Sequence, residues 1–436
     1  MSLRAPTSIE PAAPRVVTLG CRLNAGEAAA MQRHAASAGL GEAVIVNTCA
    51  VTQEAVRQGA QQIRRLRRER PGARVIVTGC AAQLEPQRYA GMAEVDHVVG
   101  NVEKMRPETY RLLAQASRAP RAMVGDVMAA RDVAALDVEA PSPIPRAFVQ
   151  VQNGCDHRCT FCVIPFGRGH SRSMRTADVV SRVRRLVEGG VPEVVLTGVD
   201  VTSWGQDQPG EPPFGRLVRA VLREVPELAR LRLSSIDQAE TDAELMAAIA
   251  EEPRLMPHLH VSLQSGADLI LKRMKRRHGR ADAIAFCADV RRRRPDIALG
   301  ADLIAGFPTE TEAHFEDTMS IVDECGLTFL HVFPYSARRD TPAARMPQLP
   351  GEVVRERATR LRKKGRAVLD DWLGRFSGQT VEVALERAGG SELPARTPQF
   401  AQVSVRGVLE GHGAGDVVEA RVVGHNDGKL VAEALA

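Results

Sequence analysis

Short apolar runs alternate with amphipathic stretches along the first third of the chain. The runs at 15–20, 43–48 and 74–79 are rich in Val and Ile and are bounded by turn residues, which is typical of buried parallel strands. Stretches with helical character fill 25–38 and 54–70 between them. This alternation predicts a doubly wound, open parallel sheet over residues 15–128, with helices on both faces.

The same alternation continues over residues 146–376. Six β/α units there predict an open (β/α)6 partial barrel rather than a closed barrel of eight strands, with its active face at the carboxyl ends of the strands. The strand-like runs are 148–152, 193–197, 231–235, 259–263, 298–304 and 329–334, and the helices between them include 176–188, 214–225, 242–250, 280–293 and 310–325.

The hydrophobic pattern of the last segment differs from that of the β/α region before it. A basic helix at 355–376 leads to short alternating runs at 380–385, 400–405, 417–423 and 429–433, separated by Gly-rich turns. This pattern predicts a small β-barrel over residues 377–436. The Pro-rich stretch 129–145 predicts an extended linker, and residues 1–14 predict a loose tail rather than a signal peptide. No apolar run reaches the ~18 residues of a membrane span, so we expect no membrane partner.

Composition narrows the class of protein. A length of 436 residues suggests about three domains. The net charge of +5 permits a nucleic-acid partner without demonstrating one. Basic stretches at 57–70, 272–278, 291–294 and 355–366 are each typical of a solvated face, but together they favour a polyanionic partner. Eight cysteines without a secretion signal indicate metal binding in a reducing, cytoplasmic setting rather than disulfides.

Three cysteines follow the first strand of the central region closely. Cys155, Cys159 and Cys162 are spaced C-x3-C-x2-C, and thiolates are soft ligands suited to iron–sulfur clusters. Because a cubane cluster has four irons, three thiolates leave one iron open for a chelating ligand. A zinc knuckle or a redox pair is the alternative, although no fourth Cys follows nearby.

Three more cysteines repeat one position in the N-terminal region. Cys21, Cys49 and Cys80 each come directly after a predicted strand. A single Cys there is usually a packed small hydrophobe, but the carboxyl ends of parallel strands share one edge, so the three predict a common metal site. Three ligands again point to a second cluster with an open iron. Cys287 and Cys325 lie in predicted helices and are expected to be core or capping residues.

The central trio, with the aromatic Phe161 before its last member, resembles the signature of the radical S-adenosylmethionine (SAM) superfamily. In that superfamily the open iron chelates the amino and carboxylate groups of SAM, whose reductive cleavage yields a 5′-deoxyadenosyl radical. The resemblance also implies cofactor contacts at the strand ends. It places backbone contacts to the methionine amino group at Gly198 and Asp200, polar SAM contacts at Ser234 and Gln264, and the glycine beside adenine at Gly306. The usual Gly-Gly-Glu is replaced here by Gly-Val-Asp, which leaves the side-chain role of Asp200 open.

A three-cysteine domain before this signature resembles the methylthiotransferase family, which inserts sulfur into an unactivated C–H bond and methylates it. The short motifs around Cys21, Cys49 and Cys80 carry this resemblance. The first of them, Cys-Arg-Leu-Asn at Cys21, is most similar to the branch acting on N6-threonylcarbamoyladenosine in tRNA, the MtaB type. The isopentenyladenosine branch more often shows Cys-Gln-Met-Asn, and the branch acting on a ribosomal-protein aspartate Cys-Pro-Lys-Asn.

The resemblance implies two [4Fe-4S] clusters, SAM, and a tRNA anticodon stem-loop as substrate with the target adenosine at position 37. It also implies an electron donor such as flavodoxin or ferredoxin. The C-terminal barrel resembles the TRAM module, which binds RNA, although Phe400 is its one obvious aromatic residue for stacking. Rival interpretations are the same chemistry on isopentenyladenosine or a ribosomal-protein aspartate, a radical-SAM enzyme that only methylates, and a non-catalytic iron–sulfur RNA-binding protein.

Overall fold

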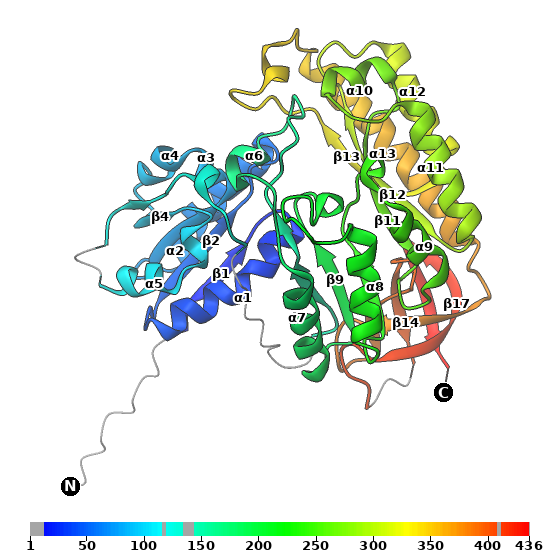
Figure 1. Ribbon diagram of the computed structural model, residues 1–436, viewed down its shortest axis with the longest axis horizontal. Helices are drawn as coiled ribbons and strands as arrows, with labels where there is room; N and C mark the ends of the chain where they lie inside the picture. The colour runs from blue at the N-terminus through cyan, green and yellow to red at the C-terminus, as the bar shows by residue number, and fades with distance from the viewer. Residues whose placement is uncertain (1–12, 116–118, 134–143, 408–410, 436) are drawn as a thin grey trace. The chain divides into compact units, whose positions relative to one another are not determined.

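The computed structural model describes residues 13–115, 119–133, 144–407 and 411–435. Their contacts divide the chain into two compact units (Figure 1). Of the described residues, unit 1 contains those up to position 133 and also Val163–Gly169, and unit 2 contains 144–162 and those from His170 onward. The predicted tail at 1–14 and linker at 129–145 lie mostly outside the described residues.

Unit 1 is built on a parallel sheet in the sequential order β1-β2-β3-β4-β5. Its strands are β1 (Arg15–Thr18), β2 (Ala43–Thr48), β3 (Arg74–Gly79), β4 (His97–Val99) and β5 (Ala122–Met123). Its helices are α1 (Arg22–Ser37), α2 (Gln53–Glu69), α3 (Cys80–Leu84), α4 (Pro86–Ala90), α5 (Pro107–Ala114) and α6 (Ile164–Arg168).

The two faces of this sheet carry separate cores. Ile45 and Ile76 pack with α1 and α5, whereas their strand neighbours Val44, Val46 and Val75 pack with α2, α3 and α4. This follows from the pleat, which sends successive side chains to opposite faces. Because α1 and α2 lie on opposite faces while the strand order stays sequential, consecutive crossovers pass over opposite faces. Helices on both faces of a parallel sheet confirm the predicted α/β class.

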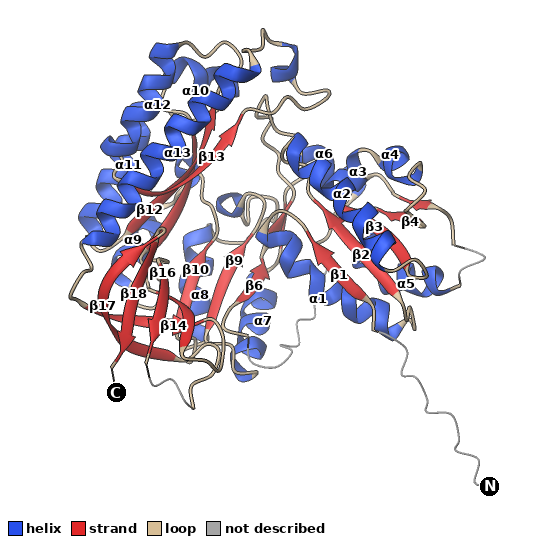
Figure 2. Ribbon diagram, turned by 180° about the vertical axis from the view of Figure 1, so that it is seen from behind, coloured by secondary structure: helices blue, strands red, loops and turns tan. Residues whose placement is uncertain are grey.

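Unit 2 contains an open partial barrel, as the alternation of runs predicted (Figure 2). Parallel sheets of β10-β9-β6 and β11-β12-β13 are joined by a parallel bridge between Ile236 and Val261. The strands are β6 (Ala147–Gln150), β9 (Glu193–Thr197), β10 (Arg230–Leu233), β11 (His258–Gln264), β12 (Ala298–Ala305) and β13 (Leu327–Pro334). The helices are α7 (Thr176–Glu188), α8 (Phe214–Glu224), α9 (Ala243–Glu251), α10 (Asp268–Met274), α11 (Arg280–Arg293) and α12 (Glu312–Glu324).

One short element in unit 2 was not anticipated from the sequence. The antiparallel pair β7 (Gln152–Asn153) and β8 (Arg172–Ser173) brackets the segment that carries Cys155, Cys159 and Cys162. Each strand is too short to show a period. The pairing nevertheless fixes both ends of the cysteine segment.

The C-terminal part is a helix followed by a closed barrel, again as predicted. Helix α13 (Gly351–Gly374) packs on β13, and the barrel has the order β14-β15-β16-β18-β17. Its strands are β14 (Thr380–Leu385), β15 (Glu392–Arg396), β16 (Gln402–Arg406), β17 (Val417–Asn426) and β18 (Lys429–Ala434). We did not predict β15, because Glu392 and Pro394 interrupt the apolar signal, and its pairing with β14 and β16 defines it instead.

Phe400 joins this small barrel to the partial barrel. Its ring lies 4.9 Å from the Arg232 guanidinium, 5.1 Å from that of Arg146 and 5.1 Å from the His258 ring centroid. These cation–π contacts use the aromatic face that RNA stacking would need. Phe400, the one aromatic residue that we singled out for base stacking, therefore serves a structural contact instead.

Candidate functional site

The three N-terminal cysteines meet at the carboxyl edge of the unit 1 sheet. Cys21 caps the start of α1, Cys49 follows β2, and Cys80 begins α3 directly after β3. Gly20 has a φ of +92°, and a Cβ at that position would lie 2.6 Å from the Cys49 Sγ. Only glycine therefore lets the β1–α1 turn approach Cys49 this closely. Cys21 is exposed, while Cys49 and Cys80 are buried.

Hydrogen-bond donors surround the buried Cys80 sulfur. The Arg168 Nε lies 3.2 Å from the Cys80 Sγ, and the Asn101 Nδ2 lies 3.7 Å from it. Asn101 also donates to the Gly167 carbonyl at 2.6 Å, which fixes α6 against this pocket. Such donors would hydrogen-bond the sulfur of a metal-bound cysteine.

Behind these donors lies a buried group of charges. Glu27 accepts hydrogen bonds from Arg168 and from Lys104, the latter at 2.6 Å, and all three side chains are almost fully buried. Burial by itself would raise the pKa of Glu27, but the two cations outweigh it and lower the pKa to about 2. Burial lowers the pKa of Lys104, and Glu27 opposes this shift. With both cations charged, the group carries one net positive charge.

This environment fits an anionic iron–sulfur cluster. A four-iron cluster in its oxidised form bound to three thiolates carries roughly one net negative charge, which the buried cations would balance. Tetrahedral zinc would hold its thiolate sulfurs about 3.8 Å apart. Among the described residues, neither cysteine trio has all its sulfur atoms within 4.8 Å of one another. The pocket therefore suits a larger metal group than a single ion.

The second trio lies in unit 2, beyond the carboxyl end of β6. Cys155, Cys159 and Cys162 are half-buried, and the Cys162 amide donates to the Cys159 carbonyl at 3.1 Å, which closes a tight turn. Burial raises the pKa of the Cys155 thiol, and the nearby Asp200 carboxylate and the other two thiols raise it further. A neighbouring metal cation would reverse this effect, because coordination favours the thiolate.

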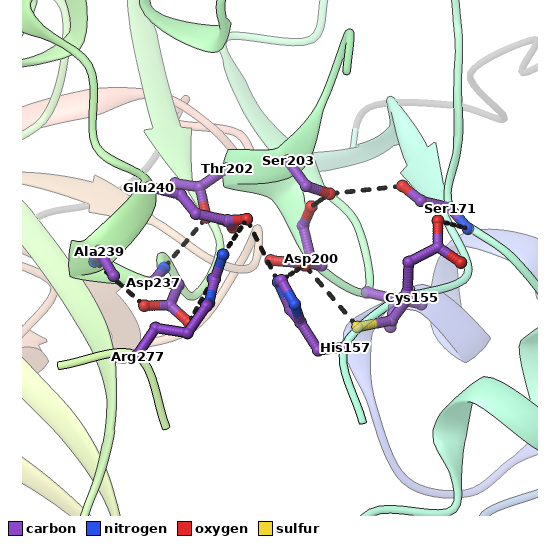
Figure 3. A network of polar contacts seen from close by, with 12 residues as sticks. Cys155, His157, Ser171, Asp200, Thr202, Ser203, Asp237, Ala239, Glu240 and Arg277 are labelled. Carbon is purple, nitrogen blue, oxygen red and sulfur yellow. Dashed lines mark hydrogen bonds and ion pairs between the residues drawn. The ribbon is translucent and has the colours of Figure 1, made fainter. Parts of the chain in front are cut away.

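Charged side chains extend from this segment across the strand ends of β9 and β10 (Figure 3). The His157 Nε2 forms ion pairs with Asp200 at 2.7 Å and with Glu240 at 3.2 Å, and these two carboxylates raise the pKa of His157 to about 10. Arg277 then joins Glu240, at 2.8 Å, to Asp237. The resulting chain of ion pairs ties the cysteine segment to the β-strand scaffold.

Arg276 connects the same network to a second cysteine. Its guanidinium donates to Asp237 at 2.9 Å and to the Ser262 carbonyl at 2.7 Å, and its NH1 lies 3.7 Å from the Cys159 Sγ. Sequence reasoning treated this residue only as part of a basic stretch. Its role appears only when β10, β11 and α10 are brought together.

The residues predicted to contact SAM lie at the strand ends as expected. The local environment differs from one of these residues to the next. Phe161 meets the Phe307 ring edge-on at 6.5 Å. Ser234 is buried, and its hydroxyl has no hydrogen-bond partner among the described residues. Gln264 follows a bulge in β11 and has a φ of 72°. A buried hydroxyl without a hydrogen-bond partner and an irregular strand end are features of a site that binds a polar ligand.

Two of these positions are held by residues that we did not single out. The Gln152 Oε1 accepts from the amides of Val199 and Asp200, both at 2.9 Å, and a Cβ on Gly198 would lie 2.8 Å from it. The Gln152 Nε2 donates to the Gly154 carbonyl at 2.8 Å, so one side chain joins the β9 loop to the cysteine segment. Its position at the end of the predicted run 148–152, just before the cysteine segment, was the signal available in the sequence.

The loop after β12 has a similar support. Gly306 has a φ of +77°, and its amide donates to the Glu310 Oε1 at 3.0 Å. Arg357 on α13 holds the same oxygen at 2.8 Å. Burial raises the pKa of Glu310 against the effect of both donors. Gly306 and Glu310 are four residues apart, and that spacing could have indicated the contact.

The two remaining cysteines and part of the basic helix α2 have structural roles. Cys287 and Cys325 are buried in the core of unit 2, which confirms the prediction for them. In α2, Arg67 bonds to Asp96 at 2.6 Å and to the Glu94 carbonyl, so part of the basic helix stabilises unit 1 itself. Among the described residues, no helix has both the length and the apolar character needed to cross a membrane.

Comparison with known proteins places this arrangement in a family. Residues 149–322 match the radical SAM superfamily, and residues 14–100 match a family described as uncharacterized protein family UPF0004. The threonylcarbamoyladenosine tRNA methylthiotransferase MtaB of Rickettsia prowazekii (strain Madrid E) is 47% identical over 95% of this chain and 96% of its own length. MtaB of Bacillus subtilis (strain 168) is 33% identical over 85% of this chain and 84% of its own.

A relative from a second branch and a solved structure complete the comparison. The tRNA-2-methylthio-N(6)-dimethylallyladenosine synthase of Novosphingobium aromaticivorans is 36% identical over 97% of both chains. The radical SAM methyltransferase TsrM of Kitasatospora setae, solved with tryptophan and a SAM analogue, covers 72% of this chain and 66% of its own with a TM-score of 0.52. At 17% identity it supports the fold alone. With its full-length relatives and its two matched regions, the chain belongs to the radical-SAM tRNA methylthiotransferase family.

Proposed function

We propose that this protein converts N6-threonylcarbamoyladenosine at position 37 of tRNA, beside the anticodon, into its 2-methylthio derivative. The observation that carries the proposal is 47% identity over almost the whole of both chains to a protein named for that substrate. The two cysteine trios, one in each matched region, support the reaction class.

The enzyme uses SAM and two [4Fe-4S] clusters, which together supply radical chemistry that replaces the adenine C2–H with a methylthio group. We assign Cys155, Cys159 and Cys162 to the cluster that cleaves SAM. Cys21, Cys49 and Cys80 would hold the auxiliary cluster from which sulfur is inserted. The buried excess of positive charge around Arg168 and Lys104 favours binding of the auxiliary cluster.

The protein side of the SAM site is built from the strand ends. Gln152 holds the backbone from Gly198 to Asp200 through the amides of Val199 and Asp200, and backbone carbonyls of this loop would contact the amino group of the ligand. The unsatisfied Ser234 hydroxyl and the amide side chain of Gln264 would bind polar SAM atoms, and Phe161 would pack beside them. Gly306, fixed through Glu310 and Arg357, would let backbone approach the adenine closely.

The substrate and the reductant come from other molecules. We propose that the enzyme acts on the tRNA anticodon stem-loop, because unstacked loop bases are those that an RNA enzyme can reach. The C-terminal barrel would contribute to RNA binding as a TRAM-like module through charge and shape, since Phe400 is engaged elsewhere. An electron donor such as flavodoxin or ferredoxin would reduce the cluster, and the need for reduced thiolates favours the cytoplasm.

Mass spectrometry of modified nucleosides tests the proposal. Purified protein is reconstituted anaerobically with iron and sulfide, then incubated with SAM, dithionite and bulk tRNA that lacks methylthio groups. We expect the 2-methylthio derivative of threonylcarbamoyladenosine and release of 5′-deoxyadenosine. Exclusive formation of the isopentenyl product would assign the second branch, which the relative from Novosphingobium represents. Absence of SAM cleavage by the reduced, iron-loaded protein would favour a non-catalytic RNA-binding protein.

A further inference from the structure

Three polar side chains outside the sites described above gather on adjacent strands of unit 2. His260 on β11, Asp302 on β12 and His331 on β13 have their ligand atoms within 4.8 Å of one another. The His260 Nε2 lies 2.9 Å from the Asp302 Oδ1, and the His331 Nδ1 lies 3.3 Å from the same oxygen. The two imidazole rings are 4.6 Å apart.

This cluster faces the interior of the partial barrel. Leu330 packs on α13, where a Cβ at Gly365 would lie 3.1 Å from it, so the next residue on β13, His331, points to the opposite face. Asp302 pairs directly with His331 in the register of β12 and β13. Asp302 also precedes Gly306 by four residues, so it lies on the inner wall about 13 Å below the predicted SAM edge at ~3.3 Å per residue.

A glycine beside His260 leaves room for the imidazole ring in this cluster. Gly300 lies beside His260 in the register, and a Cβ there would come within 3.0 Å of the His260 Nδ1. A side chain at Gly300 would therefore press on the imidazole. Burial by itself would raise the pKa of Asp302, but the hydrogen bonds from both histidines outweigh it and lower the pKa below the ordinary range. A carboxylate thus anchors both rings.

Part of the cluster remains available to a ligand. The His331 side chain is 57% exposed, and no described residue is hydrogen-bonded to its Nε2. The second oxygen of Asp302 is likewise without a hydrogen-bond partner among the described residues. Once Asp302 fixes the Nδ1 side of His331, the opposite ring edge points an ionisable nitrogen into the barrel.

We infer that His260, Asp302 and His331 form the subsite that recognises the polar N6 substituent of the substrate base. This inference rests on the proposed function and extends it. The threonylcarbamoyl group ends in a carboxylate and a hydroxyl. The His331 Nε2–H would donate to that carboxylate, and the free oxygen of Asp302 would accept from the hydroxyl.

The same geometry explains discrimination against an isopentenyl group. That group has no hydrogen-bonding atoms, so binding it here would bury the imidazole and the carboxylate oxygen without partners. A site built to hydrogen-bond a substrate rejects an analogue lacking those groups by ~10⁴- to 10⁵-fold, far more than a hydrophobic pocket can achieve. Because His331 is partly exposed, we expect a smaller preference for the threonylcarbamoyl over the isopentenyl group here, roughly 10- to 100-fold.

Binding of short RNAs tests the inference without requiring turnover. Fluorescence anisotropy compares anticodon stem-loops that differ only at position 37, carrying adenosine, its threonylcarbamoyl derivative or its isopentenyl derivative, with reconstituted full-length protein. We expect at least a tenfold preference for the threonylcarbamoyl loop over the adenosine loop. His331→Ala and Asp302→Asn should each reduce that preference to within about twofold. His331→Gln, which keeps a neutral donor, should retain part of it, and the control His314→Ala on the outer helix α12 should keep it all.

Each outcome is decisive. If the wild type prefers the threonylcarbamoyl loop and His331→Ala and Asp302→Asn leave this preference intact, the subsite is wrong while the proposed function stands. If the wild type prefers the isopentenyl loop, both fall. Two imidazoles and a carboxylate are also metal ligands, so if EDTA removes the preference and added Zn²⁺ restores it, the cluster holds a cation and the direct contact is refuted.

Discussion

Replacement of Glu27 by Gln tests the electrostatic reasoning about the N-terminal pocket. Glu27 is the carboxylate that the buried Arg168 and Lys104 share, so Glu27→Gln leaves two buried cations beside each other. The pKa of Glu27 falls from 4.5 to about 2 in the folded protein, which corresponds to about 3 kcal/mol of stability at neutral pH. Removing one partner of a buried ion pair costs roughly 3–5 kcal/mol in other proteins, which is the same range.

Hydrogen exchange of amides in α1, β2 and β3 measures the local loss of stability caused by Glu27→Gln in the full-length protein. In the cluster-free protein, Glu27→Gln should lower the free energy of opening by about 3 kcal/mol, equivalent to roughly 100-fold faster exchange. Cluster binding should restore part of the loss, because the bound cluster supplies negative charge. The matched control is Glu69→Gln, which removes an exposed carboxylate paired with Arg65 and should change nothing measurable.

The contribution of Glu27 to stability depends on pH in a defined direction. Because the folded-state pKa of Glu27 is depressed, its contribution is fully present above about pH 4.5 and is lost as the pH falls toward about 2. Wild-type protein should lose protection in these elements across that window more steeply than Glu27→Gln. A difference in opening free energy below about 1 kcal/mol in the cluster-free protein would refute the buried-pair account.

The other predictions concern the clusters and the barrel contact. Arg168→Gln removes a donor to the Cys80 sulfur and a positive charge, so the midpoint potential of the auxiliary cluster in an EPR-monitored titration should fall while the iron content persists; an unchanged potential would contradict this. Cys49→Ala should abolish thiolation of tRNA yet leave release of 5′-deoxyadenosine, and loss of neither would disprove the two-cluster assignment. Anaerobic reconstitution should load about eight irons per chain, whereas about four would indicate a single cluster. Phe400→Ala should destabilise the contact between the C-terminal barrel and the partial barrel by about 2 kcal/mol, seen as faster exchange in β14 and β16; unchanged exchange would mean that its cation–π contacts contribute little.

The periodicity of the sequence was enough to predict the sheet of unit 1, the partial barrel and the closing β-barrel. Local rules suffice there, because a buried parallel strand needs only a short Val- and Ile-rich run, and Cys21, Cys49 and Cys80 then share a sheet edge by topology. Elements without a local period were missed. Strand β15 contains Pro394 and is formed by pairing with its neighbours β14 and β16.

The electrostatic parts of the sites were decided by the tertiary structure. Glu27, Lys104 and Arg168 are separated by 77 and 141 positions in the chain, and each alone reads as a surface charge. His260, Asp302 and His331 come from consecutive strands whose register is set by pairing, not by any motif. The sequence determines which side chains face a sheet edge or a barrel interior, because pleat and helix periods are local. Only folding decides which charges share a buried volume, because that depends on contacts between residues far apart along the chain.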